Sequence, residues 1–191
     1  MPGLAIEMVK ESGDVIEIEK FASPTGDAKD GAQKLRSGVD IDFGFIALYT
    51  AVFLTFSYWL RRANLRRALL VAVIAAIFAL ATAGFDVLEN FRLYAVLDQP
   101  DRAMLENLHI ATELKWLFCF ATTALLSALF FSRRDRGFLL GIGLIFVSVL
   151  GVVGLFFYPL LEIAFGILGV LLFIIGLFVI FAPQRFVTGK A

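Results

Sequence analysis

The chain has 191 residues, of which 60% are hydrophobic and 18% charged, and its 17 basic residues balance 17 acidic ones. A water-soluble domain does not carry so much apolar sequence, and zero net charge provides no basic surface for nucleic acid. A single cysteine, Cys119, excludes an intramolecular disulfide and any Cys-x-x-Cys metal motif. The composition therefore predicts an integral membrane protein whose main partner is the lipid bilayer.

Residues 1–42 form a polar N-terminal tail. Within it, residues 15–21 (VIEIEKF) alternate apolar and acidic side chains, and residues 4–9 (LAIEMV) form another apolar run. Alternation with a period of two is typical of half-buried strands, so the pattern favours a small β-hairpin. Residues 23–31 (SPTGDAKDG) are rich in Gly, Pro and Asp and are predicted to be a linker.

Five apolar segments follow, each close to the roughly 20 residues that a helix needs to cross a bilayer. The predicted fold is therefore all-α, a polytopic bundle of five transmembrane helices. The apolar stretch 138–182 is too long for one span, and Pro159 supplies the break. The predicted spans are 43–60, 68–85, 112–131, 138–158 and 160–182, with a C-terminal tail at 183–191. Between the second and third spans we expect an outer loop with a short helix at residues 101–113, which is either separate from the third span or the start of a longer helix that contains it.

Arginines predict the orientation. They gather in the loop after the first span and in the loop after the third span. Because short loops rich in Lys and Arg stay on the cytoplasmic side, the N-terminus is predicted outside and the C-terminus in the cytoplasm. The expected location is the inner (plasma) membrane of a cell.

Glycines are concentrated in the last two predicted spans, for example Gly151, Gly154, Gly166 and Gly169. Small residues let helix backbones approach closely in lipid. Spans four and five are therefore expected to pack on each other, or to mediate contact with a protein partner or a second copy of the chain.

Ionisable residues gather at one depth. A helix rises about 1.5 Å per residue, and counting from the cytoplasmic ends of the spans places these residues near the outer boundary of the hydrocarbon. Charges are costly inside a bilayer, so this layer is the candidate functional site. Its predicted ligand-binding or ion-pair cluster consists of Asp86, Glu89, Asn90, Glu113, Lys115 and Glu162.

Lys115 is the deepest charge of the layer, and its predicted counter-ion is Asp86, with Glu89 or Glu113 as competitors. Asp86, Glu89 and Asn90 share one helix face because they are spaced i, i+3 and i+4. Without a carboxylate partner, a buried lysine tends to lose its proton.

Three interpretations of the layer remain open. It is a structural latch between helices, or a binding or permeation site for a cation or polar headgroup, or a metal site. The metal hypothesis rests on the Glu-x-x-His unit formed by Glu106 and His109, with Glu89 and Glu113 as further ligands. Di-iron sites use two such units, whereas this chain has a single histidine. No cofactor is predicted and no catalytic residue can be named, so a non-enzymatic role is favoured.

The sequence AGFDVLENFRL, followed by a lysine early in the next span, resembles a group of small multi-pass bacterial membrane proteins. These carry Asp-x-x-Glu-Asn at a helix end and a basic residue at the start of the next span. The resemblance covers Asp86, Glu89, Asn90 and Lys115 and implies no activity. The leading hypothesis is a binding or accessory membrane protein, and the alternatives are a small transporter or cation-permeation subunit and a metal-dependent membrane enzyme.

Overall fold

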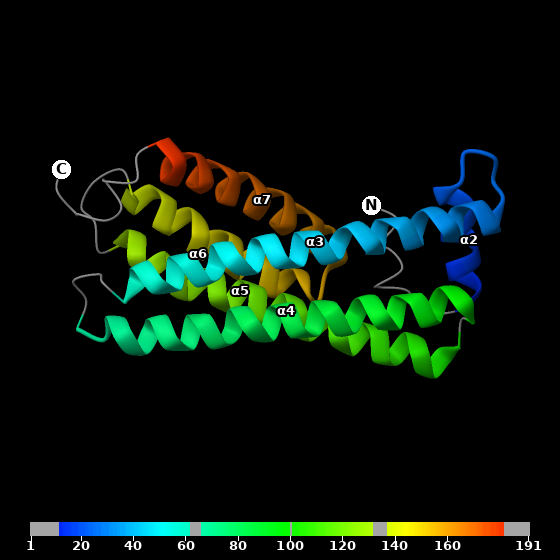
Figure 1. Cartoon of the computed structure of the whole chain (residues 1–191), viewed down its shortest axis with the longest axis horizontal. Coiled ribbons are helices and arrows are strands. Elements are labelled where there is room, and N and C mark those ends of the chain that lie inside the picture. Colours follow the sequence, from blue (N-terminus) through cyan, green and yellow to red (C-terminus); the bar gives the residue numbers. More distant parts are fainter. Residues whose placement is uncertain (1–11, 62–65, 100, 132–136, 182–191) are drawn as a thin grey trace. The chain divides into compact units, whose positions relative to one another are not determined.

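The computed structural model is helical throughout the residues it describes, which are 12–61, 66–99, 101–131 and 137–181 (Figure 1). The predicted all-α class is confirmed over these residues. Residues 4–9 and the tail at 183–191 lie outside them. The helices are α2 (Ser12–Ala22), α3 (Ala28–Leu60), α4 (Ala68–Asp98), α5 (Arg102–Phe131), α6 (Gly137–Gly154) and α7 (Tyr158–Phe181).

Four helices, α3, α4, α5 and α7, are long and apolar enough to cross a membrane. The chain thus has the make-up of a multi-pass membrane protein. The fourth predicted span, at residues 138–158, corresponds to α6, a shorter apolar helix of 18 residues.

Helices α3, α4 and α5 are longer than the predicted spans. Each has 30 to 33 residues, which makes a helix about 45–50 Å long, well beyond a hydrocarbon core of about 30 Å. The predicted outer loop is therefore wrong in its extent, because α4 continues to Asp98 and α5 begins at Arg102. Leu93, Val96 and Leu97 continue the helical spacing of apolar residues beyond residue 85, and all three are buried.

The predicted β-hairpin is wrong where the structure tests it. Residues 15–21 belong to the helix α2, whose first turn contains Asp14 and whose last turn contains Lys20. These charges suit the ends of a helix dipole. Val15 and Ile18, three residues apart, point into a hydrophobic core, so the segment follows the helical period rather than the alternation. The predicted linker is also shorter than expected, since α3 begins at Ala28.

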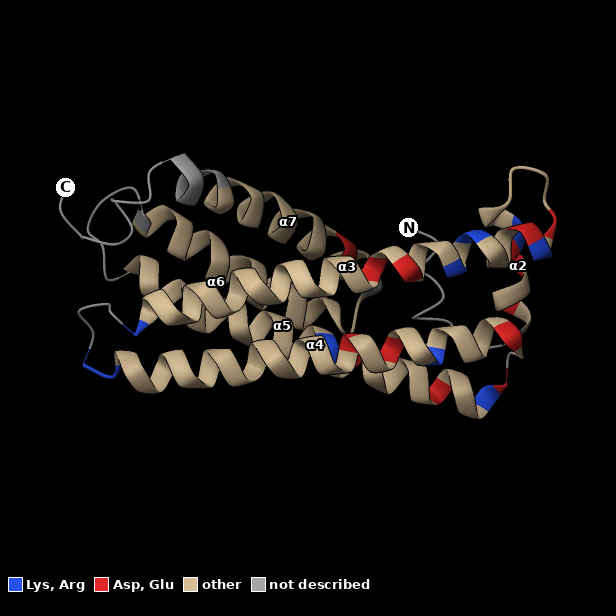
Figure 2. Ribbon diagram, viewed as in Figure 1, with Lys and Arg blue, Asp and Glu red and all other residues tan. Residues whose placement is uncertain are grey.

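The chain divides into two compact units. Unit 1 comprises residues 1–49 and 82–115, and unit 2 comprises residues 50–81 and 116–191. Figure 2 shows that the charged residues of α3, α4 and α5 lie in the stretches that belong to unit 1. Among the described residues of unit 2, the charged ones are Arg61, Arg66, Arg67 and Glu162.

Unit 1 has its own hydrophobic core, to which four helices contribute. In Figure 1, α2 turns back across the start of α3. The buried core residues are Val15, Val39, Leu93, Val96, Leu97, Leu105 and Leu108, from α2, α3, α4 and α5. The stretches outside the predicted spans therefore form a packed structure of their own.

The turn between α2 and α3 is held by short-range contacts. Gly26 adopts a positive φ of 73°, a conformation that side-chain-bearing residues rarely adopt. The Ser23 hydroxyl donates a hydrogen bond of 2.8 Å to Asp30 Oδ2. At Gly31, α3 touches the backbone of α2, because an added Cβ would lie 1.7 Å from the Glu19 carbonyl oxygen.

Unit 2 contains the α6–α7 pair and an aromatic core. Phe53, Phe120 and Phe130 are among its fully buried side chains. The chain leaves α6 after Gly154 and resumes helix at Tyr158, so the predicted fourth span ends four residues earlier than expected. Pro159 lies in the first turn of α7, where a missing N–H costs no helical hydrogen bond.

Two glycines of α6, Gly151 and Gly154, are required by close contacts. An added Cβ at Gly154 would lie 2.6 Å from the Leu161 backbone nitrogen, and at Gly151 it would lie 2.2 Å from the Phe120 ring. At Gly166 and Gly169 of α7, no described atom comes within 4 Å of such a Cβ. The predicted packing between spans four and five is therefore seen at Gly154.

Replacing Gly154 by alanine should destabilise the protein by about 2 kcal/mol, because a backbone atom of Leu161 cannot rotate away from the new methyl group. Thermal unfolding of the full chain in detergent measures this effect. Gly169→Ala is the matched control, since it adds the same methyl group in open space. Equal melting temperatures for the two variants would show that the α6–α7 contact is looser than described.

Candidate functional site: a buried polar cluster

Lys115 of α5 lies between two carboxylates of α4. Its Nζ is 2.5 Å from Glu89 Oε1 and 3.4 Å from Asp86 Oδ1. All three side chains are buried, with 1% exposure for Glu89, 6% for Asp86 and 7% for Lys115. One ammonium group thus holds two acids that sit one helical turn apart, as the i, i+3 spacing predicts.

Two hydrogen bonds connect α4 to α3 at this ion triad. The Tyr49 hydroxyl donates to Asp86 Oδ2 at 2.7 Å. The Asn90 amide nitrogen donates to Asp42 Oδ2 at 2.9 Å. Asp42 and Tyr49 are seven residues apart and therefore share a face of α3. We call the six residues Asp42, Tyr49, Asp86, Glu89, Asn90 and Lys115 the polar cluster.

The polar cluster contains more acidic than basic groups. Asp42, Asp86 and Glu89 bring three carboxyl groups, against the single ammonium of Lys115. Hydrogen bonds from Tyr49 and Asn90 offset part of this excess, because a donated hydrogen bond stabilises a carboxylate. The cluster can therefore act as a permanent latch, or it can attract a cation or a proton.

Two further contacts link α3 to α4 within unit 1. The Tyr94 hydroxyl donates to Asp40 Oδ1 at 2.5 Å. The Arg36 guanidinium pairs with Asp98 and also donates to the Leu97 carbonyl oxygen at 3.4 Å. Sequence reasoning missed both contacts, because the spacing along one helix does not indicate which face of another helix lies opposite.

The two other predicted members of the cluster, Glu113 and Glu162, lie in α5 and α7. Glu113 Oε1 is 3.0 Å from His109 Nε2, an i, i+4 pair on α5. Glu162 lies in α7, which belongs to unit 2, and its membership of the cluster stays a prediction. The predicted pairing of Lys115 with Asp86 is present at 3.4 Å, but Glu89, predicted only as a competitor, is the closer partner at 2.5 Å.

The four residues of the metal hypothesis make separate contacts. Glu106 pairs with Arg102 at 3.3 Å, His109 with Glu113, and Glu89 with Lys115. Among the described residues, no group of three or more His, Cys, Asp or Glu side chains is placed to hold a metal ion. The geometry gives the metal hypothesis no support.

Comparisons with models of known protein families, with curated proteins and with solved structures found no match to this chain. What the polar cluster does must therefore follow from its own residues.

Proposed function

We propose that the chain is a multi-pass protein of the inner (plasma) membrane with five spans. In this proposal its N-terminus lies outside the cell and its C-terminus lies in the cytoplasm. Four long apolar helices support the multi-pass arrangement, and the apolar character of the shorter helix α6 supports a further span, the fourth in chain order. The orientation is supported by Arg61, Arg66 and Arg67 in the loop between α3 and α4.

Its function, in this proposal, is that of a binding or accessory protein whose polar cluster fixes α3, α4 and α5 of unit 1 as a rigid platform. The observation that carries it is the shared ammonium of Lys115, which contacts two buried carboxylates of α4. Two hydrogen-bond donors of the cluster bind its own carboxylates, since Tyr49 donates to Asp86 and Asn90 donates to Asp42. Side chains that bind each other in this way form a fixed arrangement, and buried polar contacts can specify how helices pair.

The second candidate is a small transporter or cation-permeation subunit, which the excess of carboxyl groups in the cluster favours. Thr112, one turn before Lys115 on α5, is fully buried, and its hydroxyl oxygen has no hydrogen-bond partner among the described residues. A buried oxygen without a partner suits a passing cation. The metal-dependent enzyme is the third candidate and is supported by no contact described above.

Contact with a second copy of the chain or with another membrane protein would use α7 in this proposal. Close contacts already occupy Gly151 and Gly154 of α6, whereas Gly166, Gly169 and Gly176 of α7 have no described atom within 4 Å of an added Cβ. Such open small residues suit helix pairing in lipid.

A paired experiment separates the first two candidates. The full chain is reconstituted into liposomes for Na⁺, K⁺ and H⁺ flux assays, and it is also cross-linked in its native membranes and purified. An accessory protein should give no flux above that of protein-free liposomes, and should retain one partner in fixed stoichiometry. Glu89→Gln should weaken this complex, because it loosens the platform, whereas Arg102→Gln, which alters an exposed ion pair, should not.

A cation flux through the reconstituted protein would support the second candidate instead. A cation flux that disappears in an Asp86→Asn variant, while that variant keeps its melting temperature, would reject the accessory role and establish the second candidate.

A further inference from the structure

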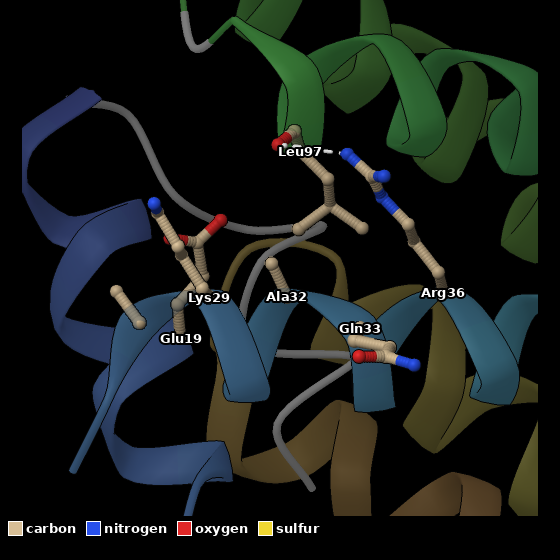
Figure 3. Close-up of a pocket in the computed structure, with 7 residues that line it drawn as sticks. Glu19, Lys29, Ala32, Gln33, Arg36 and Leu97 are labelled. Atoms are coloured by element: carbon tan, nitrogen blue, oxygen red, sulfur yellow. Dashed lines mark hydrogen bonds between the residues drawn. The ribbon is translucent and has the colours of Figure 1, made fainter.

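Unit 1 contains a pocket of about 410 Å³ that is separate from the polar cluster (Figure 3). It lies where α2, the start of α3 and the end of α4 meet. Its lining includes Glu19, Lys29, Ala32, Gln33, Arg36 and Leu97. Its volume falls within the range typical of small-molecule sites, about 300–1,000 Å³.

One wall of the pocket is a face of α3 that carries hydrogen-bond donors. Lys29, Gln33 and Arg36 follow each other at spacings of four and three residues, so they share this face. The first and last of them are about 10.5 Å apart along the helix axis. Figure 3 shows Arg36 on one side of Ala32, and Lys29 and Glu19 on the other. The small side chain of Ala32 leaves room between these charges.

Arg36 brings a guanidinium to the pocket. Its Nη2 donates to the Leu97 carbonyl oxygen and pairs with Asp98. The Arg36 side chain is 42% exposed, and a guanidinium has five N–H donors, so donors remain for a ligand in the pocket. Phosphate and carboxylate oxygens are the acceptors that a guanidinium binds most strongly.

Glu19 of α2 supplies the opposite charge. Burial raises the pKa of its carboxyl above the ordinary value, and the nearby Arg36 charge offsets part of this effect. Because desolvation is the main cause, a ligand ammonium group beside Glu19 would replace the lost water and stabilise the carboxylate. The pocket thus offers an acid at one end and several donors along its α3 wall.

We propose that this pocket binds a zwitterionic aminoalkyl phosphate, with the phosphate at Arg36 and Gln33 and the ammonium group at Glu19. The tetrahedral oxygens of a phosphate can accept from donors in several directions, whereas the two oxygens of a carboxylate lie in one plane. The same chemistry occurs in a free small molecule and in the headgroup of phosphatidylethanolamine. This site does not depend on the role of the polar cluster.

The test uses the full chain in a neutral maltoside detergent and ethanolamine phosphate as the probe, with binding measured by calorimetry. Ethanolamine phosphate should bind at least about tenfold more tightly than inorganic phosphate or ethanolamine alone, because each of these lacks one charged contact. Equal affinity for the zwitterion and either fragment would overturn the proposal.

Variants then locate the binding site. Gln33→Ala and Ala32→Leu should each weaken binding by about tenfold, the first by removing a donor to the phosphate and the second by filling the pocket. Lys34→Gln and Ser37→Leu are the matched controls on the same helix, outside the pocket lining, and should bind like the wild type. Gln33 is exposed, so its substitution leaves the fold intact even where Ala32→Leu does not. Unchanged binding in Gln33→Ala would contradict the assignment.

Lipid bilayers distinguish the two sources of the ligand. Nanodiscs of phosphatidylethanolamine should raise the melting temperature of the wild type above that in phosphatidylcholine, whose methylated nitrogen cannot donate to Glu19, if the ligand is a lipid. A response to ethanolamine phosphate alone identifies a free molecule. The absence of both responses would overturn the proposal.

Discussion

Replacing Lys115 by methionine should lower the free energy of unfolding by about 3–5 kcal/mol, because it leaves two buried carboxylates without their shared counter-charge. Methionine keeps the length of the side chain, so the effect reports charge rather than volume. Asp86 and Glu89 are 6% and 1% exposed, and water cannot take the place of the ammonium group. Reversible unfolding of the detergent-solubilised chain measures the loss.

An exposed ion pair provides the control. Arg102 and Glu106 also lie in unit 1, but their side chains are 86% and 67% exposed. Arg102→Met should therefore cost less than about 1 kcal/mol. If the two variants unfold alike, Lys115 does not hold a buried pair.

A double variant shows whether the loss comes from the stranded charge. Combining Lys115→Met with Glu89→Gln removes one of the two unpaired carboxylates, so the double variant should be more stable than Lys115→Met alone. If the loss of stability in the double variant equals the sum of the losses in the two single variants, the two residues do not interact.

The pairing of Lys115 could be predicted from the sequence because a charged side chain inside a lipid bilayer can be stabilised in few ways. A lysine within an apolar run needs a nearby acid, and Asp86 lies at a matching distance from the end of its own helix. The helical class followed from the length of the apolar runs for a similar reason, since a spanning segment must satisfy its backbone internally.

The contacts between α3 and α4 could not be predicted in this way. Whether Tyr49 meets Asp86, or Asn90 meets Asp42, depends on how each helix is rotated about its axis. The periodicity of one helix indicates its own apolar face and not the residue opposite. The α3 side chains of these contacts, Asp42 and Tyr49, are not members of the predicted cluster.

The helix α2 was missed because its pattern is ambiguous over a short segment. Ile16 and Ile18 alternate with Glu17 and Glu19, which fits a strand, while Val15 and Ile18 fit a helix equally well. Packing decides between the two, since Val15 is completely buried in the core of unit 1 and Ile16 is 44% exposed. The partners in that core come from α4 and α5, about eighty to ninety residues later in the chain.

Replacing Gly31 by alanine should detach α2 from α3. The new Cβ would lie 1.7 Å from the Glu19 carbonyl oxygen and 2.5 Å from its carbonyl carbon, and these backbone atoms cannot move without moving the helix. Detachment would withdraw Val15 from the core of unit 1. We expect the amides of Ser12–Ala22 to lose about 2–3 kcal/mol of protection, or about a hundredfold in hydrogen exchange.

Gly38→Ala is the matched control on the same helix, because no described atom lies within 4 Å of its added Cβ. That variant should gain up to about 1 kcal/mol, since alanine favours helix more than glycine does. Hydrogen exchange followed by mass spectrometry resolves α2 from the remainder of unit 1. If α2 stays protected in Gly31→Ala, the close approach of the two backbones is not a feature of the protein. If it is exposed while α4 and α5 keep their protection, α2 is a separable part of unit 1, and the pocket that contains Glu19 should lose its ligand in the same variant.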